Sequence, residues 1–175
     1  MPATATQKAA ADDDDGERPG AEAWSKAMRD LPDLPYKVET NARGQLILSP
    51  PKPEHGFSQS RTSRRIFEAL GEVVGVEFSV YTSGGVKIPD VIWMSEERRA
   101  QISEDAEASP VMPELCVEIM PDSNTEAEMA DKRRLYFDGG AEEVWIVDQG
   151  GGVRFFDTDG PIEQSTLAPD FARKI

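Results

Sequence analysis

The chain has 175 residues, of which 38% are hydrophobic, and it carries a formal net charge of −14 at pH 7. This length allows one sizeable hydrophobic core, so we expect a single domain over residues 24–175. Residues 1–23 join an Ala- and Thr-rich start to a run of aspartates, a composition that predicts a disordered acidic tail. The single cysteine, Cys116, excludes an intrachain disulfide and a thiolate metal cluster.

Charge and hydropathy also limit the partners. The tail contributes only −4, so the remainder still carries −10, which argues against tight, unassisted binding of duplex DNA. The sequence has no run of about 18 apolar residues and no signal-peptide pattern, so we expect a cytoplasmic protein without a membrane partner.

The first part of the chain predicts a helix, a hairpin and a second helix. A short helix over Ala21 to Arg29 ends at the prolines of LPDLP. YKVETN and GQLILSP then predict an N-terminal β-hairpin that turns at residues 42–44. SPPKPEHG predicts a rigid turn before a helix from about Phe57 to Leu70, which Gly71 ends.

Two groups of side chains near this second helix are candidates for function. Arg61, Arg64 and Arg65 share one helix face, and they form either a phosphate-contacting patch or an ordinary exposed face. The only histidine, His55, lies just before the expected helix start, where it either caps or hydrogen-bonds, or takes part in catalysis. Without a second histidine, the sequence offers no histidine-based zinc site.

VEFSVYT and VKIPDVIWM predict a second hairpin, and the second of these strands carries Asp90. Alternation of side chains places Asp90 between apolar neighbours, so its carboxylate needs a metal ion, a lysine or a backbone donor as partner. The following segment, SEERRAQISEDAEASP, predicts a polar connection with one or two helical turns.

The segment from 113 to 148 predicts a buried strand, a helix and a second buried strand. ELCVEIM is the first strand, and Glu118 lies near its end among apolar residues. Ser123 with Glu126, or Thr125 with Glu128, fits a capping box that begins a helix running to about Asp138.

On this helix Glu128, Lys132 and Tyr136 recur every fourth residue and share a face. Glu128 and Lys132 form either a surface ion pair or, since the connection to the strand is short, part of a site beside Glu118. EVWIVD is the second buried strand. VRFFDT and a last segment through Phe171 add to the sheet in antiparallel fashion.

These motifs resemble a known family. IPDVIWM, ELCVEIMPDSN and DKRRLYFDGGAEEVWIVD, with YKVET and GQLILSPPKPEH upstream, are similar to the bacterial family named "putative restriction endonuclease", long catalogued as a domain of unknown function, in the PD-(D/E)XK nuclease superfamily. The resemblance covers about residues 36–175. It implies an α/β (α+β) restriction-endonuclease-like fold, with a mixed central sheet flanked by helices, and Mg²⁺- or Mn²⁺-dependent hydrolysis of phosphodiester bonds in DNA.

The resemblance also assigns roles. Asp90 matches the family's PD aspartate and Glu118 the glutamate of the next strand. The superfamily's usual lysine position holds Met120, and Lys132 matches the lysine that this family supplies from the following helix. Glu128 stands where the family commonly has an acid, and residues 121–123 depart from the family's Ser-Pro-Ser.

Mg²⁺ takes oxygen ligands, which Asp90, Glu118 and the carbonyl of Ile119 supply in this interpretation. We therefore expect catalysis by Asp90, Glu118 and Lys132, with His55, Tyr136 and Glu128 as secondary candidates. Nucleic acid, bound weakly, is the expected partner, and a homodimer fits nucleases that cut two strands. Two alternatives are a catalytically silent binding or regulatory module of the same fold and a structural protein with buried ion pairs.

Overall fold

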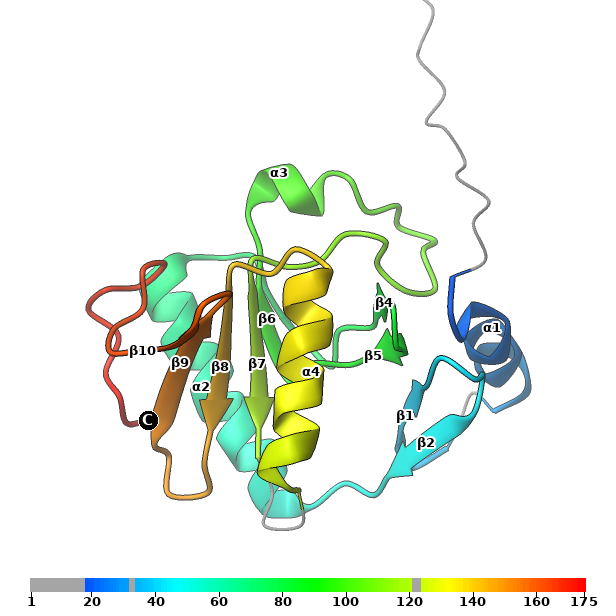
Figure 1. The fold of residues 1–175 in the computed structure, drawn as a ribbon, viewed down its shortest axis with the longest axis horizontal. Helices are drawn as coiled ribbons and strands as arrows, with labels where there is room; N and C mark the ends of the chain where they lie inside the picture. Colours follow the sequence, from blue (N-terminus) through cyan, green and yellow to red (C-terminus); the bar gives the residue numbers. More distant parts are fainter. Residues whose placement is uncertain (1–17, 32–33, 121–123) are drawn as a thin grey trace, which may run out of the picture.

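A computed structural model describes residues 18–31, 34–120 and 124–175. Its centre is a mixed six-stranded sheet in the order β10-β9-β8-β7-β6-β3 (Figure 1). The strands are β3 (Val74–Val76), β6 (Val91–Trp93), β7 (Leu115–Ile119), β8 (Glu143–Val147), β9 (Val153–Asp157) and β10 (Gly160–Ile162). The middle pair, β7 and β8, is parallel and the other pairs are antiparallel.

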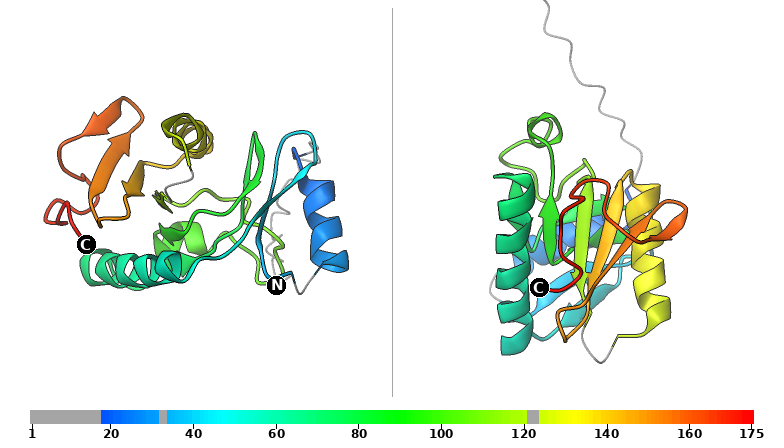
Figure 2. Two further views of the ribbon diagram at one scale, coloured as in Figure 1. Left: turned by 90° about the horizontal axis from the view of Figure 1, so that it is seen from below. Right: turned by 90° about the vertical axis from the view of Figure 1, so that its left-hand side faces the viewer.

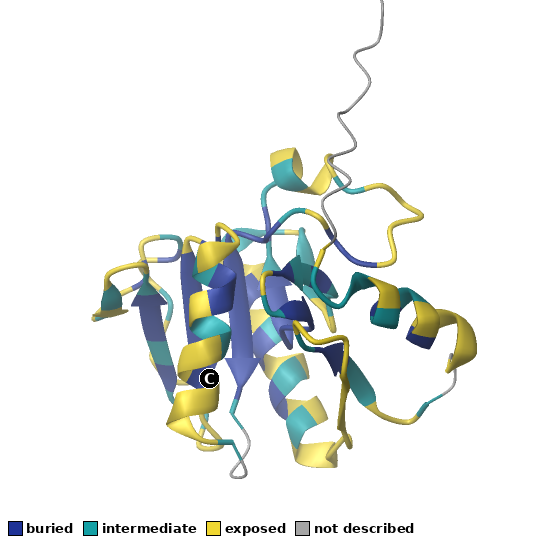
Figure 3. Cartoon of the chain, turned by 45° about the vertical axis from the view of Figure 1, so that its right-hand side comes forward, coloured by how far each residue is buried: buried dark blue, intermediate teal, exposed yellow. Residues whose placement is uncertain are grey.

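Two long helices cover the two faces of this sheet, α2 (Pro53–Leu70) on one side and α4 (Glu126–Asp138) on the other (Figure 2). Every residue of β7 is buried, as expected for a strand covered on both faces. Its alternate residues enter two cores: Leu115 and Val117 pack in a cluster with Ile66 of α2, and Cys116 packs in a cluster with Met129 of α4. Figure 3 shows the buried central strands between partly exposed helices.

A smaller layer lies beside the main sheet. It contains α1 (Ala21–Asp30) and two separate hairpins, β1 (Lys37–Thr40) with β2 (Leu46–Ser49), and β4 (Val80–Thr82) with β5 (Gly85–Lys87). Thr40 joins the hairpins, because its hydroxyl accepts the backbone N–H of Val86 at 2.9 Å and its carbonyl accepts Lys87 Nζ at 2.8 Å. Trp24 of α1 packs over β5. The contacts of Thr40 fix the first hairpin to the second, and Trp24 packs α1 onto the second hairpin.

The structure confirms the predicted N-terminal hairpin, β1 with β2. It also confirms the first two predicted helices, α1 and α2, and the strand-helix-strand segment of β7, α4 and β8. The capping box of α4 uses Thr125 and Glu128, whose backbone and side chain exchange hydrogen bonds. The connection after β6 contains one short helix, α3 (Glu96–Arg99). The tail over 1–17 and the loop over 121–123, with Ser123 as the other cap candidate, lie outside the described residues.

Three predicted boundaries were wrong. The strand VKIPDVIWM is divided into β5 and β6, because Pro89 lacks the N–H that a continuous ladder needs. VEFSVYT is divided into β3 and β4 at Glu77, whose φ of 51° is left-handed and turns the chain. Helix α2 begins at Pro53 rather than Phe57, since proline fits the first helical position, so His55 lies in its first turn.

Candidate active site

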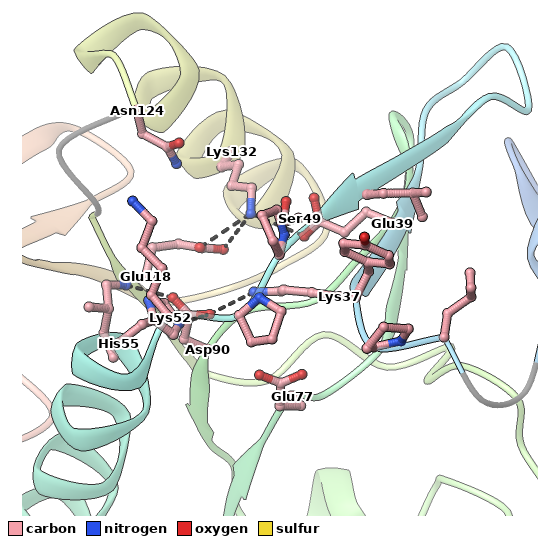
Figure 4. A pocket seen from close by; sticks show the side chains of 17 residues that line it. Lys37, Glu39, Ser49, Lys52, His55, Glu77, Asp90, Glu118, Asn124 and Lys132 are labelled. Carbon is pink, nitrogen blue, oxygen red and sulfur yellow. Dashed lines mark hydrogen bonds and ion pairs between the residues drawn. The ribbon is translucent and has the colours of Figure 1, made fainter.

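A pocket of about 460 Å³ lies where the first hairpin, the start of α2, the ends of β6 and β7 and helix α4 meet (Figure 4). Its charged lining is balanced, with four acids and four basic side chains. These are Glu39, Glu77, Asp90, Glu118, Lys37, Lys52, His55 and Lys132. The three residues predicted to be catalytic, Asp90, Glu118 and Lys132, therefore line one pocket.

Asp90 is positioned by the break between β5 and β6. It immediately precedes β6, whose first residue pairs with Val117, so it lies next to the end of β7 that carries Glu118. Its Oδ2 accepts the backbone N–H of Ile119 at 2.7 Å, and its Oδ1 accepts Lys37 Nζ at 2.6 Å and contacts His55 Nε2 at 3.1 Å. The aspartate thus has a lysine and a backbone donor, two of the partner types expected for it.

Glu118 is held by helix α4. Lys132 Nζ donates to both Glu118 oxygens at 3.2 Å, and the Tyr136 hydroxyl donates to Oε1 at 2.5 Å. Residues 132 and 136 are one helical turn apart, so both side chains reach the same carboxylate from one helix face. The short connection between strand and helix brings them together, as the sequence predicted.

The first hairpin contributes two charged residues that the sequence interpretation missed, Lys37 and Glu39. They alternate along β1 and so point to one face, where Lys37 meets Asp90 and Glu39 Oε1 accepts Lys132 Nζ at 3.0 Å (Figure 4). Glu39 also accepts the backbone N–H of Ile88 at 2.9 Å. The available signal was the pattern YKVET, in which two opposite charges share the face of a strand whose next residue, Thr40, is buried.

Burial and neighbouring charges shift the pKa values of the two carboxyl groups, Asp90 and Glu118, in opposite directions. Burial alone raises the pKa of Asp90, but the hydrogen bond from His55 and the charge of Lys37 outweigh it and hold this pKa below its usual value. Burial also raises the pKa of Glu118; the charge of Lys132 opposes this shift, and nearby Asp90 adds to it, so the net direction is upward. The two carboxyl groups therefore differ in how firmly they are ionised.

The basic groups respond to the same carboxylates. Burial lowers the pKa of Lys132, but Glu118 and Glu39 outweigh it, so the net shift is upward and the ammonium is retained. The hydrogen bond to Asp90 raises the pKa of His55 despite partial burial. Burial and the charge of Glu118 raise the pKa of Tyr136 well above its usual value, so its hydroxyl stays protonated and donates.

The remaining candidates lie away from the carboxylates. Glu128 caps α4 through Thr125 instead of pairing with Lys132. The three arginines of α2 are exposed and contact acids of the same helix. Arg61 lies 3.5 Å from Glu54, and Arg64 and Arg65 lie 3.0 and 3.6 Å from Glu68.

Comparison with known proteins decides the family. A family model described as "Uma2: Putative restriction endonuclease" matches residues 26–168. The chain belongs to this family. The Uma2 fold is also seen in a crystal structure from Anabaena variabilis, titled a "putative nuclease belonging to DUF820", with a TM-score of 0.66 and 16% identity over 86% of this chain and 93% of that one. No curated protein matches the sequence.

These findings confirm the predicted family and the predicted fold, a mixed α+β arrangement with a central sheet flanked by helices. The description of Uma2 implies nuclease chemistry and hence a nucleic-acid substrate, and restriction-endonuclease-like families generally use divalent metal ions. None of the described helices is both long and apolar enough to cross a membrane.

The side chains of this Uma2 chain suit Mg²⁺, which keeps water ligands, better than a metal ion whose ligands all come from the protein. Within the described ranges, no three His, Cys, Asp or Glu side chains are arranged to hold one ion. Mg²⁺ usually takes one or two carboxylates and completes its shell with water and substrate phosphate. Asp90 and Glu118 are two carboxylates that line one pocket, so the residue types present suit such an ion.

Proposed function

We propose that the protein is a metal-dependent nuclease in which Asp90 and Glu118 hold Mg²⁺ or Mn²⁺ and Lys132 orients the attacking water. One observation carries the proposal: Lys132 reaches Glu118 from the helix, at 3.2 Å to both oxygens, in the pocket that Asp90 also lines. A lysine in this place supplies the cation that the strand position of Met120 lacks.

Each side chain of the site has a different role in this proposal. Asp90, kept ionised by Lys37 and His55, offers a permanent negative charge. Glu118 is the second ligand candidate, and the carbonyl of Ile119 is the third. When bound, the ion lowers the pKa of a water and offsets charge on the scissile phosphate. Lys132 stays protonated. Its ammonium now donates to Glu118 and Glu39, and when an ion engages Glu118 the N–H groups released from that carboxylate can turn to the water and the developing oxyanion.

Glu39 and Tyr136 are positioning residues in this proposal. Glu39 holds Lys132 from the hairpin side, and Tyr136 fixes one oxygen of Glu118 from the helix side. Their contacts restrict Lys132 and Glu118 to one arrangement. Such restriction matters because a misplacement of about 1 Å can cost about a hundredfold in rate.

A nuclease assay tests the proposal. The pure protein with Mg²⁺ or Mn²⁺ is expected to cut nucleic acid, and Lys132→Ala is expected to abolish the cleavage. Lys26→Ala, which removes an exposed lysine of α1 paired with Asp30, is the matched control and should cut at the wild-type rate. Cleavage by Lys132→Ala at the wild-type rate would remove this lysine from the mechanism.

A second variant separates the role of the lysine from its place in the chain. Met120 lies two residues after Glu118 and packs partly buried on the same side of the sheet as Cys116. The double variant Lys132→Ala with Met120→Lys should therefore recover part of the rate. Absence of any recovery would mean that α4 provides a geometry the strand position cannot reproduce.

The alternative, a catalytically silent module of the same fold, also has a specific observation in its favour. Both oxygens of Asp90 already accept hydrogen bonds, from Ile119 on one side and from Lys37 on the other, with His55 nearby. An ion must displace Lys37 to reach Oδ1. If the protein binds nucleic acid and Mn²⁺ but cuts no substrate, this alternative is favoured.

A further inference from the structure

The carboxylates of the candidate site lie at the base of the pocket and not on an open surface. Asp90 and Glu118 are 1% and 3% exposed. The first hairpin, the segment that joins β2 to α2, and Asn124 and Lys132 all line the space in front of them (Figure 4). A phosphodiester that reaches these carboxylates must therefore enter the pocket.

The size of the pocket limits which form of nucleic acid can place a phosphodiester at these carboxylates. Its volume of about 460 Å³ is in the range of cavities that hold one small organic molecule. Specific complexes with duplex DNA instead bury about 1,000–2,500 Å² of a strongly basic protein surface. A nucleotide with a free base can enter a space of this size, whereas a paired strand brings its partner strand against the hairpin wall.

One side of the pocket is apolar and suits an unpaired base. Tyr36 and Leu48 line it and are 44% and 48% exposed, with Pro35, Pro50 and Pro51 beside them in the lining. Proteins that bind single strands combine basic groups along the backbone with aromatic rings on which bases stack. Here Lys37 and Lys52 supply the basic groups of the same pocket.

The net charge and the arginine face of α2 give a duplex little support. The chain carries −14, and the three clustered arginines of α2 contact Glu54 and Glu68 of their own helix. Duplex binding requires lysines and arginines that neutralise phosphates of both strands. The described basic groups that face the candidate site are instead gathered inside the pocket.

We propose that the site takes single-stranded nucleic acid, with one unpaired nucleotide in the pocket and its base against Tyr36. This inference rests on the proposed nuclease function for its cleavage step but not for its binding step. It names the substrate class of that site, and it applies to DNA and RNA alike, since the pocket features used here contact base and phosphate.

The test compares oligonucleotides of one sequence on the full-length wild-type protein with Mn²⁺. The substrates are single-stranded DNA, single-stranded RNA, a blunt DNA duplex and a duplex with a central unpaired bubble. We expect kcat/KM at least about tenfold higher for a single strand than for the duplex, and cuts in the bubble substrate confined to the bubble. Equal or faster cleavage of the blunt duplex would overturn the inference.

A binding measurement separates failure of this inference from failure of the proposed function. With metal chelated, fluorescence anisotropy should show tighter binding of single strands than of duplex. If nothing is cut but this preference is found, the nuclease function fails and the single-strand inference stands. If neither form binds and none is cut, both fail.

Variants of the apolar wall complete the test. Tyr36→Ala should raise KM for single-stranded substrate about fivefold or more, with kcat little changed, and Tyr36→Phe should behave as wild type because the ring remains. Phe67→Ala is the matched control, since Phe67 is 51% exposed on α2 and lies outside the pocket lining. Equal effects of Tyr36→Ala and Phe67→Ala would exclude stacking on Tyr36.

Discussion

Asp90 keeps a negative charge at the base of the pocket because each of its oxygens has a donor. The shortest of these contacts joins Lys37 Nζ to Asp90 Oδ1 at 2.6 Å, and the Lys37 side chain is largely buried. Removing one partner of a buried pair is costly, since the other charge is left uncompensated. Lys37 therefore neutralises the Asp90 carboxylate, and an ion bound as we propose would compete with it.

This arrangement gives a prediction for Lys37→Met, which keeps most of the aliphatic stem. With metal chelated, the variant should lose about 3 kcal/mol of unfolding free energy. Mn²⁺ should then stabilise it more than the wild type, because the competing ammonium is absent. Thermal denaturation with and without Mn²⁺ measures both effects, with Lys26→Met as control. Equal responses to Mn²⁺ in both proteins would contradict competition between Lys37 and the ion.

His55 provides a prediction of pH dependence for the metal-free protein. Its pKa is raised in the folded state, first by the hydrogen bond to Asp90, so the folded state binds its proton more tightly than the unfolded state. Its contribution to stability is complete below the unfolded-state pKa near 6.5 and is lost as pH rises through the folded-state pKa.

The replacement His55→Gln keeps a donor but does not titrate. The difference in unfolding free energy between wild type and this variant should be larger at about pH 5.5 than at about pH 8.5. Chemical denaturation with a chelator present measures it, and no other histidine complicates the comparison. A difference independent of pH would mean that the imidazole is not protonated beside Asp90.

At the scale of single residues, the sequence predicted the parts of the site that local patterns encode. Asp90 and Glu118 stand out because each is an acid among apolar neighbours, and Lys132 because it follows Glu118 by a short connection. Lys37 and Glu39 were missed because only the packing of Thr40 against Val86 and Lys87 brings their hairpin to the pocket. That contact joins segments more than 40 residues apart, so the charge pattern of YKVET alone did not show that this strand face meets Asp90 and Lys132.

At the scale of elements, the predictions succeeded where burial and periodicity agreed and failed at chain breaks. β7, α4 and β8 were predicted because two-sided burial makes the strands mostly apolar, with one glutamate each, and a capping box begins the helix. The division at Pro89 was missed, although proline marks it, because VKI and VIWM both fit a strand. Directly after this break, the backbone N–H of Asp90 donates to the carbonyl of Val117 at 3.0 Å, and its side chain accepts the N–H of Ile119.

Glu128 gives a test at this scale, because it has one role in the cap and another in the family pattern. Glu128→Gln preserves the capping box, so both stability and cleavage should be unchanged. Thr125→Ala removes the side-chain acceptor for the Glu128 N–H and should cost about 1 kcal/mol in denaturant unfolding. Loss of cleavage in Glu128→Gln, with stability intact, would place Glu128 in the chemistry.

At the scale of the whole molecule, the charge of −14 means that phosphate binding depends on a few local cations. The balanced pocket supplies such cations, with Lys37 and Lys132 already engaged by carboxylates and Lys52 at the N-cap of α2. The net negative charge of the chain repels a polyanion. We therefore expect weak binding that depends steeply on salt.

The salt dependence can show whether the pocket or the arginine face of α2 binds the phosphates. For a single-stranded oligonucleotide with metal chelated, the logarithm of the binding constant should fall linearly with the logarithm of salt concentration, by about 0.7 per phosphate contact. Lys52→Gln should reduce that slope by about 0.7, because Lys52 lines the pocket. The triple variant Arg61→Gln, Arg64→Gln and Arg65→Gln should leave the slope unchanged, since acids of the same helix already neutralise these side chains. A smaller slope in the triple variant, with Lys52→Gln behaving as wild type, would instead make the exposed face of α2 the phosphate-binding surface.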